Sequence, residues 1–267
     1  MTQPATNEAL VLRTDTDGIA TLTLNRPDHF NTLSTPTMLK LKAHLAAIAT
    51  DTSVRVVVIT GAGKAFCAGH DLKEMQSDPS ESTMRAMFDL CSDNMIAITS
   101  LPQPVIAKIN GVATAAGCQL VAQCDLAIST DMAKFGTSGI NIGLYCSTPS
   151  VPVTRNLSRK HAMELLMTGD LIPAHKAQEW GLINRCVPAE DLDTAVNDMA
   201  QKIASKSPEA IALGKDLFYT QLEEGMAAAY ARAGNAITCN MLSTATQSAI
   251  DSFLDKSTLP QWPDRKN

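Results

Sequence analysis

The chain has 267 residues, of which 45% are apolar and 18% are charged, and its formal net charge is −5. This length can bury a full core, so one large domain, with or without a small addition, is expected. The acidic balance offers no basic surface for nucleic acid, and no apolar run reaches the roughly 20 residues that cross a membrane, so neither is expected as a partner.

The first elements expected along the chain are a β-hairpin and a helix. Alternating or continuous apolar residues predict strands at 10–12 and 19–24, joined through the turn residues Thr16-Asp17-Gly18. Thr35 followed by Pro36 marks a helix start, and apolar residues at helical spacing extend this helix to about residue 48.

Two strand–loop units follow, with a helix at about 82–99 between them. The strand at 54–60 leads into the first loop, Ala65 to Leu72, and the strand at 105–109 leads into the second, Asn110 to Leu120. Both loops are rich in small residues, which let a ligand approach the backbone closely. Free N–H groups at a helix start carry partial positive charge, so two of them aimed at one point would form an oxyanion hole.

The rest of the chain changes from a mixed to a helical pattern. A short helix at about 115–124 leads to strands at 126–129 and 134–136, and this alternation predicts an α/β fold with right-handed crossovers. We therefore expect a core domain, residues 1–188, and a C-terminal helical region, residues 189–267. The helices of that region are expected near 190–205, 208–222, 225–240 and 244–255.

Common cofactor and nucleophile motifs fail on this sequence. Val58 stands where a phosphate-binding loop ending at Gly63-Lys64 needs its first glycine, and Ala65 replaces the required Ser or Thr. Phe66 replaces the third glycine of a dinucleotide-binding turn, and no G-x-S-x-G elbow exists. The seven cysteines and five histidines show no ligand spacing, so no metal site is expected. Free thiols in apolar surroundings, and a start without a targeting pattern, favour a reducing, cytoplasmic location.

Several short motifs follow one another in a specific order and spacing. They are Leu24 to Pro27, Phe66 to Met75, Pro104 to Ala107 with Asn110-Gly111, Gly117 to Leu120, Cys124-Asp125, Phe135-Gly136, Leu166 to Asp170 and Ala177 to Leu182. Together they resemble the enoyl-CoA hydratase/isomerase (crotonase) family over nearly the whole chain. The resemblance implies a crotonase (ClpP-like) spiral of ββα turns. It also implies a C-terminal helical region that drives assembly into a homotrimer or a dimer of trimers.

The resemblance further implies a ligand and the residues that hold it. Members of the family bind an acyl-CoA thioester, in which coenzyme A is part of the substrate, and no cofactor is bound permanently. They polarise the thioester carbonyl with two main-chain N–H groups, which by position belong to His70 and Ala116. The substrate-binding residues implied in this way are Arg26, Asp28, Phe30, Ala68, His70, Asp71, Leu72, Lys73 and Ala116.

Alternatives remain open for several of these residues. His70 can act through its backbone alone or also through its imidazole. Asp71 can cap the helix that follows it, and Lys73 can bind a phosphate or simply be solvated. Both loops could also be no more than tight strand-to-helix turns.

The sequence departs from the hydratase pattern at both catalytic glutamates. The family motifs place them where this chain has Gln119 and Gly139. A glutamine is no general base near neutral pH, and a glycine has no side chain. Candidate replacements are Gln119 itself, one helical turn from Ala116, and also Asn141 and Cys146, whose thiol could act only with a lowered pKa. In these departures the chain resembles the subgroup typified by enoyl-CoA-hydratase-domain-containing protein three.

Three functions are therefore open. The first is an acyl-CoA enzyme of the hydratase/isomerase kind that works through an enolate, or one with another crotonase reaction, namely isomerisation, decarboxylation or thioester hydrolysis. The second is a catalytically inactive acyl-CoA-binding or regulatory protein, which is indicated by Gln119 and Gly139 in place of the two catalytic glutamates. The third is an unrelated α/β fold with coincidental loops, which a titration with coenzyme A would separate from the other two.

Overall fold

The first elements of the described residues are the expected hairpin, β1 (Val11–Thr16) and β2 (Ile19–Leu24), and then α1 (Thr35–Thr50). The computed structural model describes residues 9–258 and 260–265. Helix α1 begins as the sequence predicts, because the Ser34 side chain accepts a hydrogen bond from the N–H of Thr37 and a proline stands in the first turn.

The larger of two sheets has six strands in the order β1-β2-β3-β5-β7-β10. Its central strands β3 (Val56–Gly61), β5 (Val105–Ile109) and β7 (Leu126–Thr130) are parallel and almost entirely buried, which explains their nearly continuous apolar sequences. The second sheet has the order β4-β6-β8-β9. The remaining strands are β4 (Ala65–Cys67), β6 (Val112–Thr114), β8 (Lys134–Gly136), β9 (Ile172–Pro173) and β10 (Arg185–Val187).

Each turn of the chain places one strand in each sheet before the next helix. Strand β3 is followed by β4, β5 by β6, and β7 by β8, and corresponding strands of successive turns pair in parallel. This arrangement confirms the predicted α/β spiral of ββα turns. Because the turns stack, loops that are about 45 residues apart in the sequence can lie next to each other.

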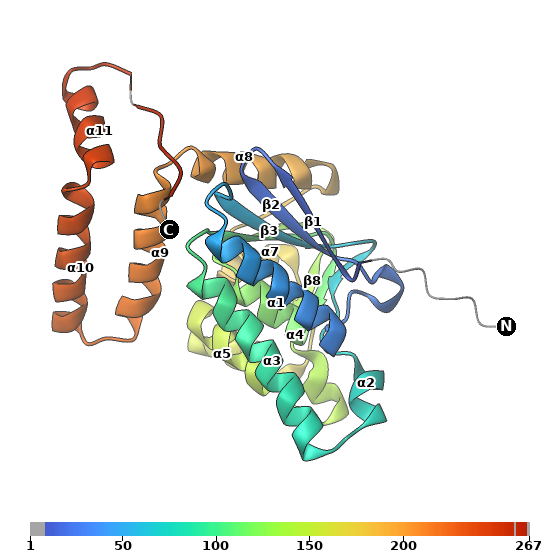
Figure 1. Ribbon diagram of the computed structural model, residues 1–267. Coiled ribbons are helices and arrows are strands. Elements are labelled where there is room, and N and C mark those ends of the chain that lie inside the picture. Colours follow the sequence, from blue (N-terminus) through green and yellow to red (C-terminus); the bar gives the residue numbers. More distant parts are fainter. Residues whose placement is uncertain (1–8, 259, 266–267) are drawn as a thin grey trace.

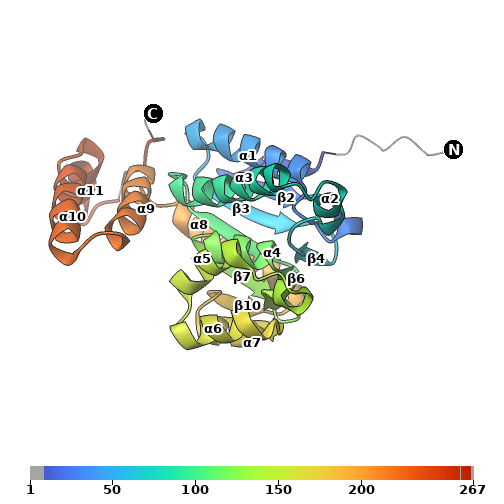
Figure 2. The ribbon, with the colours of Figure 1, turned by 90° about the horizontal axis from the view of Figure 1, so that it is seen from below.

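Helices cover the sheets and close the main core. Figure 2 shows α1 and α3 side by side on one flank of the sheets, with α6 and α7 on the other. The core between these layers contains the fully buried Phe66, Phe135 and Leu22. The helices of this part of the chain, besides α1, are α2 (Leu72–Ser77), α3 (Glu81–Ser100), α4 (Ala116–Gln123), α5 (Ser147–Asn156), α6 (Arg159–Thr168) and α7 (Ala174–Trp180).

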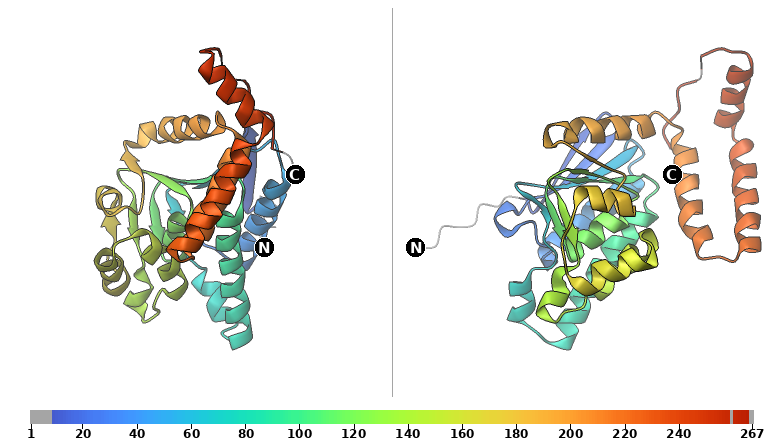
Figure 3. Two further views of the ribbon diagram at one scale, coloured as in Figure 1. Left: turned by 90° about the vertical axis from the view of Figure 1, so that its left-hand side faces the viewer. Right: turned by 180° about the vertical axis from the view of Figure 1, so that it is seen from behind.

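The C-terminal helices lie where the sequence predicts them, but they have two different environments. Helix α8 packs Leu192 and Val196 against the outer face of the larger sheet, so it belongs with the body. The next three helices project from the body as an arm (Figures 1 and 3). Lys215 is the one buried residue of the arm helices within the described part of the chain. The four helices are α8 (Leu192–Ala204), α9 (Pro208–Leu222), α10 (Met226–Met241) and α11 (Thr244–Leu254).

The division of the chain at residues 188 and 189 stays a prediction. The packing of α8 favours counting residues up to Ala204 with the body and only α9 to α11 as the appended region.

Candidate active site

The two small-residue loops lie against each other after strands β4 and β6. A Cβ atom built on Gly69 would lie 2.9 Å from the Cβ of Ala115 and 3.2 Å from the main-chain nitrogen of Ala116. One built on Gly117 would lie 2.0 Å from the carbonyl oxygen of Cys67. Real side chains do not tolerate such contacts, so glycine at these two positions is what allows the loops to meet.

The residues directly before His70 and Ala116 both have positive φ angles. Gly69 has φ 97°, and Ala115 has φ 49° and ψ −119°, a conformation that alanine rarely adopts. Ala116 is the first residue of α4, where the helix itself offers no acceptor for its N–H. In the parts of the chain that the structure describes, neither this N–H nor that of His70 has a main-chain acceptor.

Two nearby main-chain N–H groups, in contrast, are bound inside the protein. The N–H of Ala115 donates to the carbonyl oxygen of Gly136 at 2.9 Å, and the N–H of Ala68 donates to that of Phe30 at 3.0 Å. The N–H groups of His70 and Ala116 thus differ from those of the residues at 68 and 115, whose main-chain partners lie within the protein.

A cavity of about 770 Å³ opens beside these donors. Its lining includes residues from both loops, from the segment before α1 and from the segment between β8 and α5. Most of its walls are apolar, which is usual for a site that binds a small molecule. The predicted residues in the lining are Asp28, Phe30, Ala68, His70, Asp71, Leu72, Lys73, Ala116 and Cys146.

Comparison with known proteins agrees with this architecture. A family model described as "Enoyl-CoA hydratase/isomerase" matches residues 14–265. The chain belongs to the enoyl-CoA hydratase/isomerase family. The mitochondrial enoyl-CoA hydratase domain-containing protein 3 of Rattus norvegicus is 39% identical over 259 residues, 97% of this chain and 86% of the rat protein.

Solved structures of family members resemble the whole chain. The crystal structure of an enoyl-CoA hydratase from Mycobacterium smegmatis has a TM-score of 0.94 and 48% identity, covering 95% of this chain and 99% of the other. That of human enoyl-CoA hydratase domain-containing protein 3 has a TM-score of 0.91 and 38% identity, covering 94% and 99%.

Three predicted site residues lie outside the cavity lining in the described residues. Arg26 forms an ion pair with Asp71 at 3.1 Å. The Asn141 amide donates to the carbonyl oxygen of Gly169 at 3.0 Å. Gln119 is buried in α4, with its Oε1 3.9 Å from the Sγ of a cysteine in α3.

The walls also contain residues that the sequence analysis did not single out. Phe88 lies in the predicted helix at 82–99, next to the buried Met87 of that helix, and its apolar side chain was the one signal available for it. Met75 ends the motif Phe66 to Met75, but that motif does not show that its side chain reaches the cavity. The tertiary structure brings in further residues, which include Thr32, Ser138 and Tyr145.

The surroundings of the His70 imidazole favour one tautomer and the neutral form. Its Nδ1 lies 3.4 Å from the carbonyl oxygen of Leu33, which can only accept, so Nδ1 carries the proton. Its ring meets that of Phe88 edge to face, with centroids 5.4 Å apart. Burial lowers the pKa of His70, more than the Leu33 contact and Glu74 raise it. The buried Nε2, for which no partner is found among the described residues, is therefore a free acceptor.

Cys146 and the backbone fill the space beside Gly139, where the family motif expects a glutamate. A Cβ built on Gly139 would lie 2.5 Å from the carbonyl oxygen of Leu144 and 2.9 Å from the Sγ of Cys146. Burial raises the pKa of the Cys146 thiol, against the opposing hydrogen bond from Gly139. The thiol therefore stays protonated near neutral pH, which disfavours it as a base or nucleophile.

No group of three or more His, Cys, Asp or Glu side chains that could hold a metal occurs among residues 9–258 and 260–265. Within the same residues, no helix is both long enough and apolar enough to span a lipid bilayer.

Proposed function

We propose that this chain binds an acyl-CoA thioester and catalyses a reaction that passes through its enolate. The N–H groups of His70 and Ala116 hold the thioester oxygen and stabilise the negative charge that develops on it. The observation that carries this proposal is that both residues line one cavity and both donors lack a main-chain acceptor. One donor of this kind is typically worth roughly 3–4 kcal/mol of barrier.

The rim of the cavity suits the coenzyme A part of the substrate. Phe30 and Leu72 are 60% and 51% exposed at the cavity, and Lys73 is also exposed there. The two apolar side chains can pack on the pantetheine or adenine, and the ammonium group can pair with a phosphate. The apolar interior then receives the acyl chain.

The reaction does not rely on two water-activating carboxylates. Gln119 and Gly139 supply neither, and the raised pKa of Cys146 leaves that thiol unsuited to replace them. We therefore favour isomerisation or decarboxylation, which pass through the enolate. Thioester hydrolysis, which shares only the polarised carbonyl, and hydration both need a water molecule that some other group activates.

A second candidate is a catalytically inactive acyl-CoA-binding or regulatory protein. Gln119 and Gly139, which replace the two glutamates, favour this candidate. A chain that binds the thioester but lacks a carboxylate to accept the proton would polarise the carbonyl without turnover.

Exchange of the α-proton tests enolate formation without assuming the final product. Butyryl-CoA is incubated with the protein in D₂O, and mass spectrometry follows deuterium at C2. Exchange above the uncatalysed rate is expected. Binding of butyryl-CoA without exchange would favour the inactive binding protein, and a failure to bind coenzyme A or its thioesters would refute both candidates.

The arm supports a homotrimer or a dimer of trimers. Several large apolar side chains between the start of α9 and the end of α11 are more than half exposed. They are Phe218, Met226, Tyr230, Ile237, Leu242 and Phe253. An apolar surface of this kind is typical of a protein interface. Analytical ultracentrifugation should find three or six copies of the 28.5 kDa chain, and a monomer would contradict the assembly. The cytoplasmic location stays a prediction, since the animal relatives carry "mitochondrial" in their names.

A further inference from the structure

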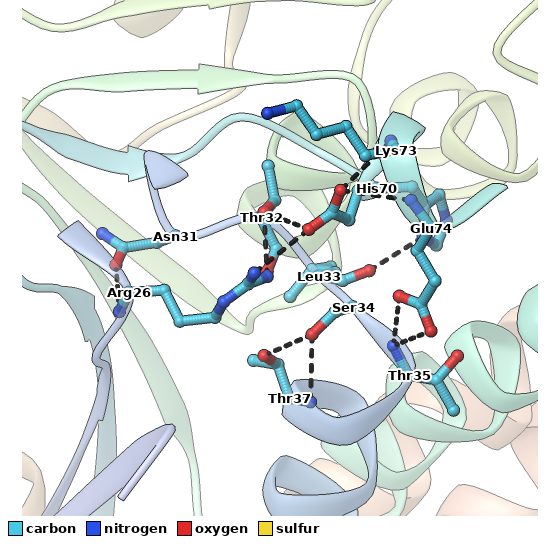
Figure 4. Close-up of polar contacts among 11 residues, drawn as sticks. Arg26, Asn31, Thr32, Leu33, Ser34, Thr35, Thr37, His70, Lys73 and Glu74 are labelled. Carbon is cyan, nitrogen blue, oxygen red and sulfur yellow. Dashed lines mark hydrogen bonds and ion pairs between the residues drawn. The ribbon is translucent and has the colours of Figure 1, made fainter. Parts of the chain in front are cut away.

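Arg26 joins the two segments that surround His70. Its Nη2 donates to Asp71 Oδ2 at 3.1 Å, while its Nη1 donates to the carbonyl oxygen of Thr32 at 3.1 Å and to the hydroxyl of Thr32 at 3.0 Å. Figure 4 shows the guanidinium group of Arg26 reaching Thr32. The side chains of Arg26 and Asp71 are only 17% and 15% exposed, so this ion pair is better shielded than a surface pair.

The Asp71 carboxylate is bound on two sides. Its Oδ1 accepts the N–H groups of Lys73 and Glu74 at 3.2 and 3.4 Å and thereby caps α2. Burial raises the pKa of Asp71, but the hydrogen bonds from Arg26 and Glu74, together with the charge of Arg26, outweigh burial and lower that pKa overall. The carboxylate therefore stays ionised. The residue that follows His70 is therefore fixed both to its own helix and to Arg26.

The backbone before His70 is tied to the same neighbouring segment. The N–H of Leu33 donates to the carbonyl oxygen of Gly69 at 2.8 Å, and Leu33 and His70 form a parallel bridge. The carboxylate of Glu74 accepts the N–H of Thr35 at 2.9 Å (Figure 4). These contacts leave the His70 peptide little freedom to rotate.

We propose that Arg26 is a positioning residue, which fixes the direction of the His70 N–H through Asp71 and Thr32 and does not bind coenzyme A itself. This inference rests on the proposed oxyanion role of that N–H. The guanidinium group of Arg26 donates its hydrogen bonds to Thr32 and Asp71. Arg26 lies outside the cavity lining of the described residues, whereas Asp71 belongs to the lining. Without the guanidinium group, the one side-chain contact left between Thr32 and Asp71 in the described chain is the longer one from the Thr32 hydroxyl to Asp71 Oδ2, at 3.5 Å, and the His70 donor moves off the carbonyl.

The test measures carbonyl polarisation and coenzyme A binding separately. The probe is 4-(dimethylamino)cinnamoyl-CoA, whose absorbance moves to longer wavelength when its carbonyl accepts strong hydrogen bonds. In Arg26→Met, the red shift on binding should fall to less than half of the wild-type value, while the Kd for free coenzyme A changes less than twofold. Arg26→Lys should restore the shift only partly, because lysine gives a point charge without a fork.

Arg13→Met is the matched control. Arg13 is likewise ion-paired, with the carboxylates of Asp15 and Asp51, and its side chain is 20% exposed, but it lies in β1 and outside the cavity lining of the described chain. This variant should keep the full red shift.

Stability is separated from positioning by a double variant. Arg26→Met combined with Asp71→Asn removes the unpaired charge and should recover part of any loss in melting temperature, but not the red shift. A full red shift in Arg26→Met would overturn the inference, as would a tenfold weaker Kd for coenzyme A, which would indicate a direct contact. If the wild type binds the probe without any red shift, the proposed oxyanion role fails, and this inference fails with it.

Discussion

Gly117→Ala should separate the two loops that form the candidate site. The added methyl group would lie 2.0 Å from the carbonyl oxygen of Cys67, 2.7 Å from its carbonyl carbon and 2.9 Å from its Cβ. Since carbon and carbonyl oxygen seldom approach closer than about 3.3 Å, the start of α4 must retreat by roughly 1 Å. Ala116 directly precedes this residue, so its N–H moves away from His70.

The expected loss of reaction rate follows from this displacement of the Ala116 N–H. A misplacement of about 1 Å costs roughly 10²-fold in rate, or about 2.7 kcal/mol of barrier. Crowding of a packed interior should also cost about 1–3 kcal/mol of folding free energy. The assays are α-proton exchange of butyryl-CoA in D₂O and thermal unfolding.

A matched glycine serves as the control. Gly214 lies inside α9, and a Cβ built on it meets nothing within 4 Å. Gly214→Ala should leave exchange unchanged and stability equal or higher, by up to about 1 kcal/mol. Wild-type exchange in Gly117→Ala would refute the reasoning, because the close approach of the loops would then not matter.

Three further changes test other parts of the site and fold. Because the pKa of folded His70 lies below the 6.5 of an ordinary histidine, the unfolded chain binds the proton more readily, and stability is lost as pH falls below about 6.5. The melting temperature of His70→Gln should therefore fall less between pH 7.5 and 5.5 than that of the wild type, and equal slopes would contradict the assignment. Gly139→Glu, even combined with Gln119→Glu, should not gain hydration of crotonyl-CoA and should lose about 1–3 kcal/mol of stability, since Leu144 and Cys146 occupy the space; new hydratase activity would show that the segment yields. Lys215→Met removes the buried partner of Asp125 at 2.6 Å and should cost about 3–5 kcal/mol in denaturant unfolding, whereas an unchanged midpoint would show that this pair does not hold α9 to the body.

Much of the fold could be predicted because its signals are local. The strands at 105–109 and 134–136 and the four C-terminal helices lie within a few residues of their predicted bounds. Uniform apolar runs mark buried strands, and residues such as Ser207 with Pro208 mark helix starts. The three helices between residues 147 and 180 were not predicted, since they are short and α5 contains Pro149 and Pro152.

The site was only partly predictable because it depends on distant contacts. The loop residues His70 and Ala116 follow from the motifs, and so does the capping role of Asp71, which the structure bears out. The pairing of Arg26 with Asp71 joins residues 45 positions apart, and no pattern in the sequence indicates that the arginine faces the protein and not the ligand. The space taken by Cys146 beside Gly139 likewise depends on how the segment between them folds back.

A crystal structure with bound butyryl-CoA tests the central claim most directly. The account predicts that the thioester oxygen lies about 2.7–3.1 Å from the main-chain nitrogens of both His70 and Ala116. A thioester oxygen that contacts neither nitrogen, while the coenzyme A occupies the same cavity, would contradict it.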